Sequence, residues 1–595
     1  MEDIGVVYYG YVFDASGYGN AARSYIHAMH EAGIRLSVVD LAGRRHQVHD
    51  ELVESLQKQN VDADFHLFHG IPPQWARMAF KQPRGIGMTV WETDVMPSQW
   101  RNALNHMLEV WLPCEFNVST FGKSLDRPVF RMPHPLGAHA SSELKETTDH
   151  LSEIRDGDFI FYGIFEWQDR KCPSGLLSSY LRSFSAADHT TLVIKTNPGA
   201  AGAARAALDA ARNETRSDAG VTLYAEGWSD AQIAGLHKRG DCYVSLHRGE
   251  GWNCPLFDAA SKGKPVIATA YSGPLDYLNS HDHLLVRYKN CPVRQPYLYY
   301  NPNMQWADPD LGHASELMRW TYEHQEESCA MAQRASAAIR DSYSPRSIGE
   351  LAKARLTALL RRARPERWRE LPIAQRAQAL APSVPIRGDW YDADYFETGF
   401  KSNWTNGYTW ASFSGVFRDA AGFLTSIFPD ARSFLDVGCA KGFLVRTLRE
   451  EGKDAWGIDF SPWAIRNADR FCARYLELNS VDLYPFDKQV DVMLAFSLME
   501  SLTETQIHNF LRRARLATQK AFFAVIATRE DEEPASPDQG DNDLAHITLR
   551  TRSWWTTQFD LAGWRPESDA SELLEACRNH PVPQHMKWGV YVRLP

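Results

Sequence analysis

The stretch His247–Thr269, HRGEGWNCPLFDAASKGKPVIAT, predicts the fold of this chain, because it belongs to one parallel β-α-β unit. An apolar run, Cys242–Leu246, precedes it as a first strand, and Pro265–Ala268 forms a second strand. Between the strands, a polar loop carries Glu250 and a helical pattern carries Asp258. Open α/β sheets bind ligands at the carboxyl ends of strands, where ionised carboxylates accept hydrogen bonds from sugar and ribose hydroxyls. We therefore expect an α/β fold with a ligand-binding loop at Glu250.

This stretch resembles the E-x7-E motif of the family 4 retaining glycosyltransferases, including the trailing Gly-Lys-Pro-Val-Ile-Ala-Thr. The resemblance implies that Glu250 lies on the donor sugar as a catalytic group. It also implies that Asp258, which stands where the family has a second Glu, contacts the ribose from a shorter stem. The alternative is that Glu250 caps a helix and Asp258 lies on a solvated helix face. The flanking strands favour the glycosyltransferase interpretation.

The resemblance covers roughly the first 350 residues and implies a GT-B architecture of two Rossmann-like domains, with the donor mainly on the second. Strands that alternate with helices predict doubly wound domains. We expect residues 1–150 to form the acceptor-side domain and residues 151–350 to form the nucleotide-sugar-binding domain.

Length and composition restrict the other function classes. At 595 residues, with 44% hydrophobic and 23% charged residues, the chain is a globular protein of several domains. The net charge of -10 argues against a nucleic-acid partner. Nine scattered cysteines without a C-x-x-C pair predict reduced thiols and a cytoplasmic location. The acidic N-terminus predicts a first strand and no signal peptide, and no apolar run reaches membrane-spanning length.

Two neighbouring cations are the candidate catalytic partners of the departing diphosphate. No metal motif is visible, so we expect no metal and assign the positive charge that the leaving group needs to Arg170 and Lys171. They resemble the family's R-K-N-P segment, with Cys172 where Asn is usual. Lys195 ends a buried Val-Ile run and is a second candidate, although a surface position is its alternative interpretation.

A glycine-rich turn after the first strand, Asp14–Asn20, allows backbone amides to approach a phosphate, although a bare turn fits this segment equally well. Trp228 lies in the turn after a strand, and in the family this turn lies beside the nucleobase of the donor. The resemblance implies a set of donor-binding residues: Gly17, Gly19, Lys195, Trp228, Asp258 and Gly273.

Three candidate acceptor residues follow apolar runs in the first domain. Trp91 is suited to stacking on a sugar face, and His69 and Glu92 are suited to binding acceptor hydroxyls. A core or capping role is open for each of them.

Residues 351–387 predict a basic helix followed by a linker, because arginines dominate before a segment broken by prolines. One interpretation is peripheral contact with anionic lipid at the inner membrane face, where lipid-linked acceptors lie. The other, which we favour, is a helix packed on its neighbours with solvated arginines.

A second nucleoside-binding pattern begins with Ser433–Gly442, SFLDVGCAKG, which reads as strand, glycine turn and helix start. Asp459 ends the next strand, where an acid accepts hydrogen bonds from ribose hydroxyls, and a dinucleotide fold is the competing interpretation. The pattern resembles the class I S-adenosylmethionine-dependent methyltransferases, with Ala440 where their middle glycine is usual. The resemblance implies a Rossmann-like methyltransferase domain over residues 388–595.

In that family, Asp482 matches the acid that binds the adenine amino group. The cofactor-binding residues that the resemblance implies are Asp436, Gly438, Gly442, Asp459, Phe460, Asp482 and Leu483.

A histidine late in this domain, His546, is a candidate catalytic base for a sugar hydroxyl. A structural histidine in a turn is an equally open interpretation. Met499 and Glu500 directly follow the expected fourth strand.

The first hypothesis is a bifunctional enzyme. It transfers a sugar from a nucleotide-sugar donor to a glycan acceptor with retention and methylates a hydroxyl of the product with S-adenosyl-L-methionine, in bacterial surface polysaccharide (O-antigen-like) biosynthesis. Two alternatives stay open. One is an enzyme that glycosylates and methylates a natural product, and the other is a chain in which one module has become a scaffold.

Overall fold

A computed structural model describes residues 4–42, 48–137, 147–294, 296–371, 386–399, 401, 402, 404, 407–482, 484, 486, 488–528, 543–565, 569 and 589–595. The chain divides into two compact units, Met1–Pro372 and Ile373–Pro595. Among the described helices, none has the length and apolarity needed to cross a membrane. The eight cysteines in the described ranges form no disulfide.

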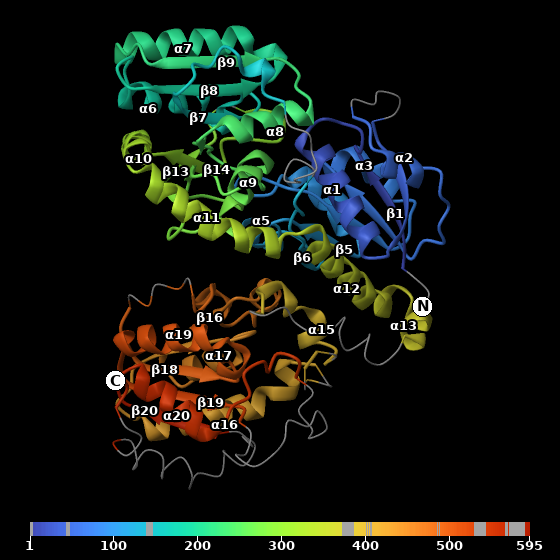
Figure 1. Ribbon diagram of the computed structural model, residues 1–595. Helices are drawn as coiled ribbons and strands as arrows, with labels where there is room; N and C mark the ends of the chain where they lie inside the picture. The colour runs from blue at the N-terminus through green and yellow to red at the C-terminus, as the bar shows by residue number, and fades with distance from the viewer. Residues whose placement is uncertain are drawn as a thin grey trace. The chain divides into compact units, whose positions relative to one another are not determined.

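The first unit begins with a sheet of six parallel strands in the order β2-β1-β3-β4-β5-β6 (Figure 1). Its strands are β1 (Gly5–Gly10), β2 (Arg35–Asp40), β3 (Phe65–His69), β4 (Gly85–Met88), β5 (Glu109–Leu112) and β6 (Val129–Arg131). The helices between them are α1 (Gly17–Glu31), α2 (Glu51–Leu56), α3 (Pro72–Ala79), α4 (Arg101–Asn105) and α5 (Glu115–Gly122). Apart from the partly exposed edge strand β2, most residues of these strands are buried, as expected for a parallel sheet covered on both faces.

A second parallel sheet follows in the same unit, in the order β12-β11-β10-β7-β8-β9. Its strands are β7 (Phe159–Ile164), β8 (Thr190–Thr196), β9 (Gly220–Ala225), β10 (Cys242–Ser245), β11 (Val266–Thr269) and β12 (Leu284–Val286). Its helices are α6 (Pro173–Ser183), α7 (Ala201–Thr215), α8 (Asp230–Arg239), α9 (Cys254–Ser261), α10 (Leu311–Glu323) and α11 (Gln325–Ser342). The sequence analysis did not predict the antiparallel hairpin of β13 (Tyr288–Pro292) and β14 (Gln305–Pro309).

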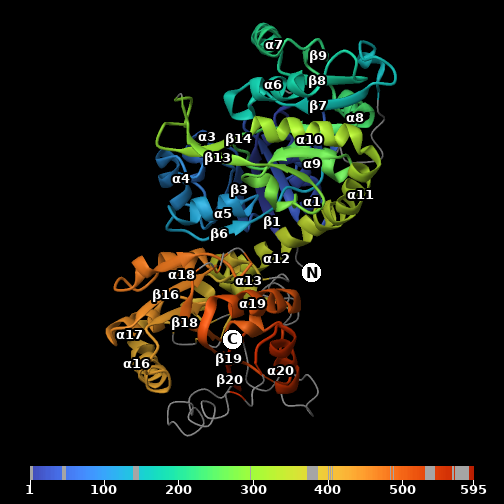
Figure 2. The same ribbon diagram turned by 90° about the vertical axis from the view of Figure 1, so that its left-hand side faces the viewer.

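The basic segment forms α12 (Pro345–Ala363) and α13 (Pro365–Glu370), and α12 packs against α1 (Figure 2). A Cβ atom at Gly349 would lie 2.1 Å from the carbonyl oxygen of Ala28, so glycine allows this close approach. Arg355 donates hydrogen bonds to buried Glu109. These contacts support the packing interpretation of the helix, and lipid contact stays a prediction.

The second unit contains a mixed sheet in the order β17-β16-β15-β18-β19-β20, in which only β20 is antiparallel to its neighbour. Its strands are β15 (Ser433–Val437), β16 (Asp454–Asp459), β17 (Leu476–Leu478), β18 (Val490–Phe496), β19 (Thr518–Ile526) and β20 (Gly589–Arg593). Its helices are α15 (Ala393–Phe396), α16 (Trp410–Ile427), α17 (Phe443–Glu450), α18 (Pro462–Arg466), α19 (Glu504–Ala517) and α20 (Arg552–Leu561).

The predicted fold class is therefore confirmed. The first unit has two Rossmann-like domains, the GT-B arrangement, and the second unit has a Rossmann-like domain with one added antiparallel strand.

Candidate functional site

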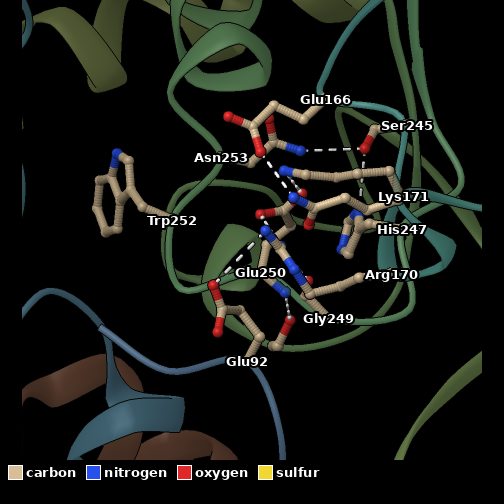
Figure 3. A network of polar contacts seen from close by, with 12 residues as sticks. Glu92, Glu166, Arg170, Lys171, Ser245, His247, Gly249, Glu250, Trp252 and Asn253 are labelled. Atoms are coloured by element: carbon tan, nitrogen blue, oxygen red, sulfur yellow. Dashed lines mark hydrogen bonds and ion pairs between the residues drawn. The ribbon is translucent and has the colours of Figure 1, made fainter. Parts of the chain in front are cut away.

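Glu250 lies in the loop after β10 and is 4% exposed. Its Oε1 accepts a hydrogen bond of 2.5 Å from Lys171 Nζ, and its Oε2 accepts one of 2.8 Å from Arg170 Nη1 (Figure 3). Burial would raise the pKa of Glu250, but Lys171, Arg170 and His247 outweigh it and hold the pKa at about 2. The structure thus brings together the three predicted catalytic residues of the first unit.

Glycines around Glu250 let two backbone segments approach it closely. A Cβ atom at Gly249 would lie 2.1 Å from the carbonyl oxygen of Glu92, and one at Gly251 would lie 2.6 Å from Val90 Cβ. At Gly273, a Cβ atom would lie 2.2 Å from the carbonyl oxygen of Gly251. A side chain at Gly249 or Gly251 would push the Glu250 loop away from the segment after β4, and one at Gly273 would push the Gly273 turn away from the Glu250 loop.

A chain of hydrogen bonds fixes the base of this loop. Asn253 Nδ2 donates to Ser245 Oγ at 3.0 Å, and Ser245 Oγ lies 3.0 Å from Nδ1 of His247. His247 Nε2 lies 3.1 Å from the carbonyl oxygen of Tyr271. Burial lowers the pKa of His247, which favours a neutral ring that donates to Tyr271 and accepts from Ser245. Asn253 has a φ of 71° and caps α9, a left-handed conformation that Asn tolerates.

The two cations come from the 3-10 turn η4 (Asp169–Lys171), between β7 and α6. Burial lowers the pKa of Lys171, and the charge of Arg170 adds to this effect against the opposing Glu250. For Arg170, burial opposes the charged form, but Glu92 and Glu250 raise the pKa above its ordinary value. Cys172 has a φ of 51°, in the left-handed region that Asn tolerates better than most residues. Cys in this position therefore adopts the turn conformation at a cost in conformational free energy.

Glu92 belongs to the same network, although it was predicted as an acceptor ligand. It accepts a hydrogen bond of 2.6 Å from Tyr300 Oη and lies 3.7 Å from Arg170 Nη2. Trp91 is 3% exposed and stacks on Tyr300, with ring centroids 4.5 Å apart. Sequence reasoning missed Tyr300, and its signal was the aromatic run Tyr297–Tyr300 at the tip of the β13–β14 hairpin.

His69 ends β3 and is 2% exposed, with Nδ1 at 2.6 Å from the hydroxyl of Tyr8. Its Nε2 has no hydrogen-bond partner among the described residues. Burial lowers the pKa of His69 to about 3, so the ring is neutral. The sequence analysis did not select His134, whose ring lies 6.5 Å from that of His69 and 5.4 Å from that of Trp252. These neutral rings line the carboxyl ends of the first sheet.

The two predicted glycines near the N-terminus differ in their surroundings. A Cβ atom at Gly17 would meet nothing within 4 Å, whereas one at Gly19 would lie 2.0 Å from the carbonyl oxygen of Asp14. Ser16 caps α1 by accepting a hydrogen bond from the amide of Gly19. Gly19 is thus required by the turn itself, and Gly17 leaves the helix N-terminus open.

The remaining donor candidates lie on the second sheet. Lys195 is partly buried at the end of β8, and this burial lowers its pKa against the opposing charges of Glu226 and Glu166. Trp228 Nε1 donates a hydrogen bond of 3.0 Å to Glu226, and its ring packs on His150 at 4.5 Å. Asp258 is 5% exposed on α9, and the contacts described for it do not test a ribose-binding role.

In the second unit, the predicted glycine turn follows β15. Gly438, Ala440 and Gly442 have φ values of 81°, 49° and 79°. A Cβ atom at Gly442 would lie 2.6 Å from Leu476 Cδ1, so this position needs glycine for space as well as for conformation.

Asp459 ends β16 and is oriented by two amides. The amide of Ala440 donates to Oδ2 and that of Ser461 donates to Oδ1, both at 2.8 Å. Each oxygen keeps a second acceptor site, which fits the two hydroxyls of a ribose. Burial raises the pKa of Asp459 to about 6 despite these amides. Burial and the charge of Asp459 raise the pKa of Asp436 to about 7. Hydroxyl donors of a bound nucleoside would therefore stabilise the ionised forms of Asp436 and Asp459. These acceptors fit the ribose of S-adenosylmethionine.

Two other predicted cofactor residues lie near the same strand ends. The ring of Phe460 lies 5.3 Å from that of Tyr391. Asp482 Oδ2 accepts a hydrogen bond of 2.7 Å from Gln506 of α19. Leu483 lies outside the described residues.

His546 is buried beside two carboxylates, neither of which was selected from the sequence. Its Nε2 lies 3.6 Å from Glu500 Oε1 and 3.9 Å from Asp543 Oδ2. Glu500 comes directly after the fourth strand of the sheet, which was the available signal. No group of three or more His, Cys, Asp or Glu suited to a metal ion occurs in the part of the chain that the structure describes.

A family model described as a methyltransferase domain matches residues 413–570. The search of curated proteins gave no match. Similar solved structures include HepE from Anabaena in complex with UDP and glucose, with 11% identity, a TM-score of 0.44, and coverage of 59% of this chain and 98% of that chain. A glycosyltransferase from Rickettsia africae has 11% identity, a TM-score of 0.46, and coverage of 60% and 99%. WaaG, a glycosyltransferase involved in lipopolysaccharide biosynthesis, has 13% identity, a TM-score of 0.40, and coverage of 58% and 98%.

The sheet orders and the family match define the class of the molecule. It joins two Rossmann-like domains with the GT-B fold to a region that matches the methyltransferase domain model.

Proposed function

We propose that this chain is a bifunctional enzyme of glycan synthesis. The first unit transfers a sugar from a nucleoside-diphosphate donor to a glycan hydroxyl with retention, and the second unit methylates a hydroxyl of the product with S-adenosylmethionine. The observation that carries the proposal is the buried Glu250–Arg170–Lys171 cluster in the loops at the carboxyl ends of β7 and β10.

The cluster supplies what departure of a nucleoside diphosphate requires. Negative charge builds on the leaving phosphate oxygens, and Arg170 and Lys171 can share their hydrogen bonds between these oxygens and Glu250. Glu250 is ionised, with a pKa of about 2, and can support positive charge that develops on the donor sugar. Glu92, which belongs to the other Rossmann-like domain, lies beside Nη2 of Arg170 and helps to fix its guanidinium group.

The second unit provides the cofactor site of the proposal. S-adenosylmethionine, when bound, supplies an electrophilic methyl group. Asp459 would accept hydrogen bonds from the cofactor's ribose. The glycine turn at Gly438–Gly442 would let the cofactor come close to the backbone. We propose a cytoplasmic location for the protein. The glycan acceptor that we propose belongs to a bacterial surface polysaccharide.

Mass spectrometry of glycans from cells with and without the protein tests the proposal. Cells without it should make glycans that lack one sugar residue and one O-methyl group. Identical glycans in the two strains would contradict the proposed function. If the glycans of cells without the protein lack only the methyl group, the sugar-transfer activity proposed for the first unit is wrong.

A further inference from the structure

A buried carboxylate with no hydrogen-bond partner in the described part of the chain lies in the turn after β18. Glu500 belongs to the 3-10 turn η9 (Met499–Ser501), and its side chain has no exposed surface. Neither Oε1 nor Oε2 has a hydrogen-bond partner among the described residues. Burial of such a group costs free energy unless a partner compensates, so this carboxylate requires an explanation.

The turn that carries Glu500 lies against the predicted cofactor loop. A Cβ atom at Gly438 would lie 3.1 Å from Leu498 Cδ1, two residues before Glu500. β18 is the direct neighbour of β15, whose end carries Asp436. Glu500 therefore lies at the same edge of the sheet as the proposed methyl donor.

His546 lies within ion-pair distance of this carboxylate, and the other carboxylate beside the ring, Asp543, is already engaged. Asp543 Oδ2 accepts a hydrogen bond of 2.9 Å from Tyr395 Oη, and its Oδ1 accepts one of 2.9 Å from the amide of Ala545. Glu500, in contrast, has both oxygens available to receive the proton on His546 Nε2, which lies 3.6 Å from Oε1.

We propose that Glu500 is a positioning residue for methyl transfer: at 3.6 Å its charge favours a proton on Nε2 of His546, so that Nδ1 can act as the base. This inference rests on the proposed methyltransferase function. The acceptor oxygen forms a bond to the methyl carbon while the carbon–sulfur bond breaks and its electron pair stays on sulfur. The hydroxyl proton passes to His546. The imidazolium that forms lies beside Glu500 and Asp543, which stabilise it.

The electrostatics of the pair agree with this role. Burial raises the pKa of Glu500 to about 7, with a further contribution from Asp543. The charge of His546 opposes this, as do the amides of Glu500 and Ala527, which lie near the carboxylate without meeting hydrogen-bond geometry. Tyr391 and Tyr395 also face Glu500, and burial raises the pKa of both hydroxyls, so they stay neutral. The charge state of Glu500 therefore changes near neutral pH and is coupled to that of its histidine partner.

The test uses the full-length protein and S-adenosylmethionine with a tritiated methyl group. The acceptor is glycan extracted from cells in which the Asp459→Ala variant replaces the wild type, because this glycan should carry the added sugar but lack the methyl group. Glu500→Gln keeps the shape of the side chain and removes its charge. We expect kcat/KM for methyl transfer to fall about 100-fold or more. We expect the limb of the pH–rate profile that reports the pair to move to lower pH, because imidazolium loses a stabilising charge.

Three controls separate positioning from structure. Glu500→Asp keeps the charge and should recover at least about tenfold of the lost kcat/KM. Glu504→Gln removes an exposed carboxylate, paired with Arg550 on the surface, and should change neither rate nor profile. Cofactor binding by calorimetry should stay within about twofold of wild type in both Glu500 variants, because Glu500 contacts the base and not the cofactor ribose.

Near-normal methyl transfer by Glu500→Gln would overturn the inference. A reduced rate with an unmoved pH profile and no recovery in Glu500→Asp would show a structural role and would also overturn it. If Glu500→Gln fails to fold, His546→Gln is measured instead, and a profile that keeps the same limb overturns the inference. Absence of cofactor binding by the wild-type protein would instead remove the proposed methyltransferase function itself.

Discussion

Glu250 in the first unit and Asp436 and Asp459 in the second are all buried carboxylates at the carboxyl ends of parallel strands, but their surroundings differ. Two cations of its own domain contact Glu250, and its pKa is about 2. Burial raises the pKa of the two aspartates to about 7 and about 6. The first site is therefore balanced in charge without a ligand, whereas the second lacks donors that a ligand can supply.

This difference has consequences for binding in each unit. A diphosphate that enters the first site must share Arg170 and Lys171 with Glu250, so part of its binding free energy offsets weakened internal ion pairs. A nucleoside that enters the second site brings hydroxyl donors to carboxylates that are only partly compensated. We expect ligand binding to raise the melting temperature of the second unit more than that of the first at equal saturation.

The largest effect is expected from Glu250→Ala. Sugar transfer should fall at least about 10³-fold, because the variant removes the carboxylate from the donor sugar and leaves two buried cations unbalanced. Methyl transfer should persist. Sugar release from the donor and methyl incorporation are measured in parallel on the same preparation. Glu214→Ala, which breaks an exposed ion pair with Arg182 in the same domain, is the matched control and should change neither activity. Near-normal sugar transfer by Glu250→Ala would refute the assignment.

Much of the fold could be predicted because its signals are local. Apolar strands, glycine turns and the strand-loop-helix segment around Glu250 each specify structure within about 25 neighbouring residues, and the parallel sheets follow from their alternation. Glu250, Arg170 and Lys171 could be chosen for the same reason. The antiparallel strand β20 was not predicted, because its pairing with β19 depends on contacts between segments far apart in the chain.

The contacts that connect distant segments could not be predicted. Glu92 and Tyr300 are 208 positions apart, and no local pattern indicates that they bond. In the same way, nothing in the sequence around Glu500 indicates that His546 lies beside it. The assignment of Glu92 to the acceptor stays a prediction, and its contact with Arg170 is what the sequence did not indicate.

In the second unit, Asp459→Ala should weaken binding of S-adenosylmethionine by about 2–4 kcal/mol, while sugar transfer persists. The variant leaves both ribose hydroxyls without their acceptor in a buried site. Calorimetry on the full-length protein measures the loss. Asp454→Ala lies at the other end of β16, where it breaks an exposed contact with Arg449, and should leave the affinity unchanged. Equal affinities of the Asp459 variant and the wild type would contradict the ribose assignment.

The two units should also respond differently to pH. Because folding raises the pKa of Asp436 to about 7, its stabilising contribution is complete below about pH 4 and is lost as the pH rises through 7. Glu250 has a lowered pKa, so its contribution is complete above about pH 4.5 and is lost only as the pH falls through 2. Between pH 8 and pH 5, Asp436 should therefore add stability to the second unit on the order of a few kcal/mol, and Glu250 should add none to the first.

Scanning calorimetry of the wild type and of Asp436→Asn measures this contribution. The melting temperature of the second unit should rise on acidification from pH 8 to pH 5 more in the wild type than in the variant. Equal changes in both proteins would show that Asp436 is already compensated, and the contrast between the two units would then fail.

The smallest expected effect concerns Ala440, which stands between two glycines of the cofactor turn with a φ of 49°. This left-handed conformation costs an L-residue roughly 1–2 kcal/mol, whereas glycine adopts it freely but loses more conformational entropy on folding. Ala440→Gly should therefore raise the unfolding free energy of the second unit by about 0.5 kcal/mol, and its amide can still donate to Asp459. Ala420→Gly, in the interior of helix α16, should instead lower stability by about 1 kcal/mol, because glycine is a poor helix former. The melting temperatures of the two variants should therefore move in opposite directions. A decrease in both would show that the backbone of the turn is not strained at Ala440, and that its conformation is not what distinguishes this cofactor loop from a glycine-rich one.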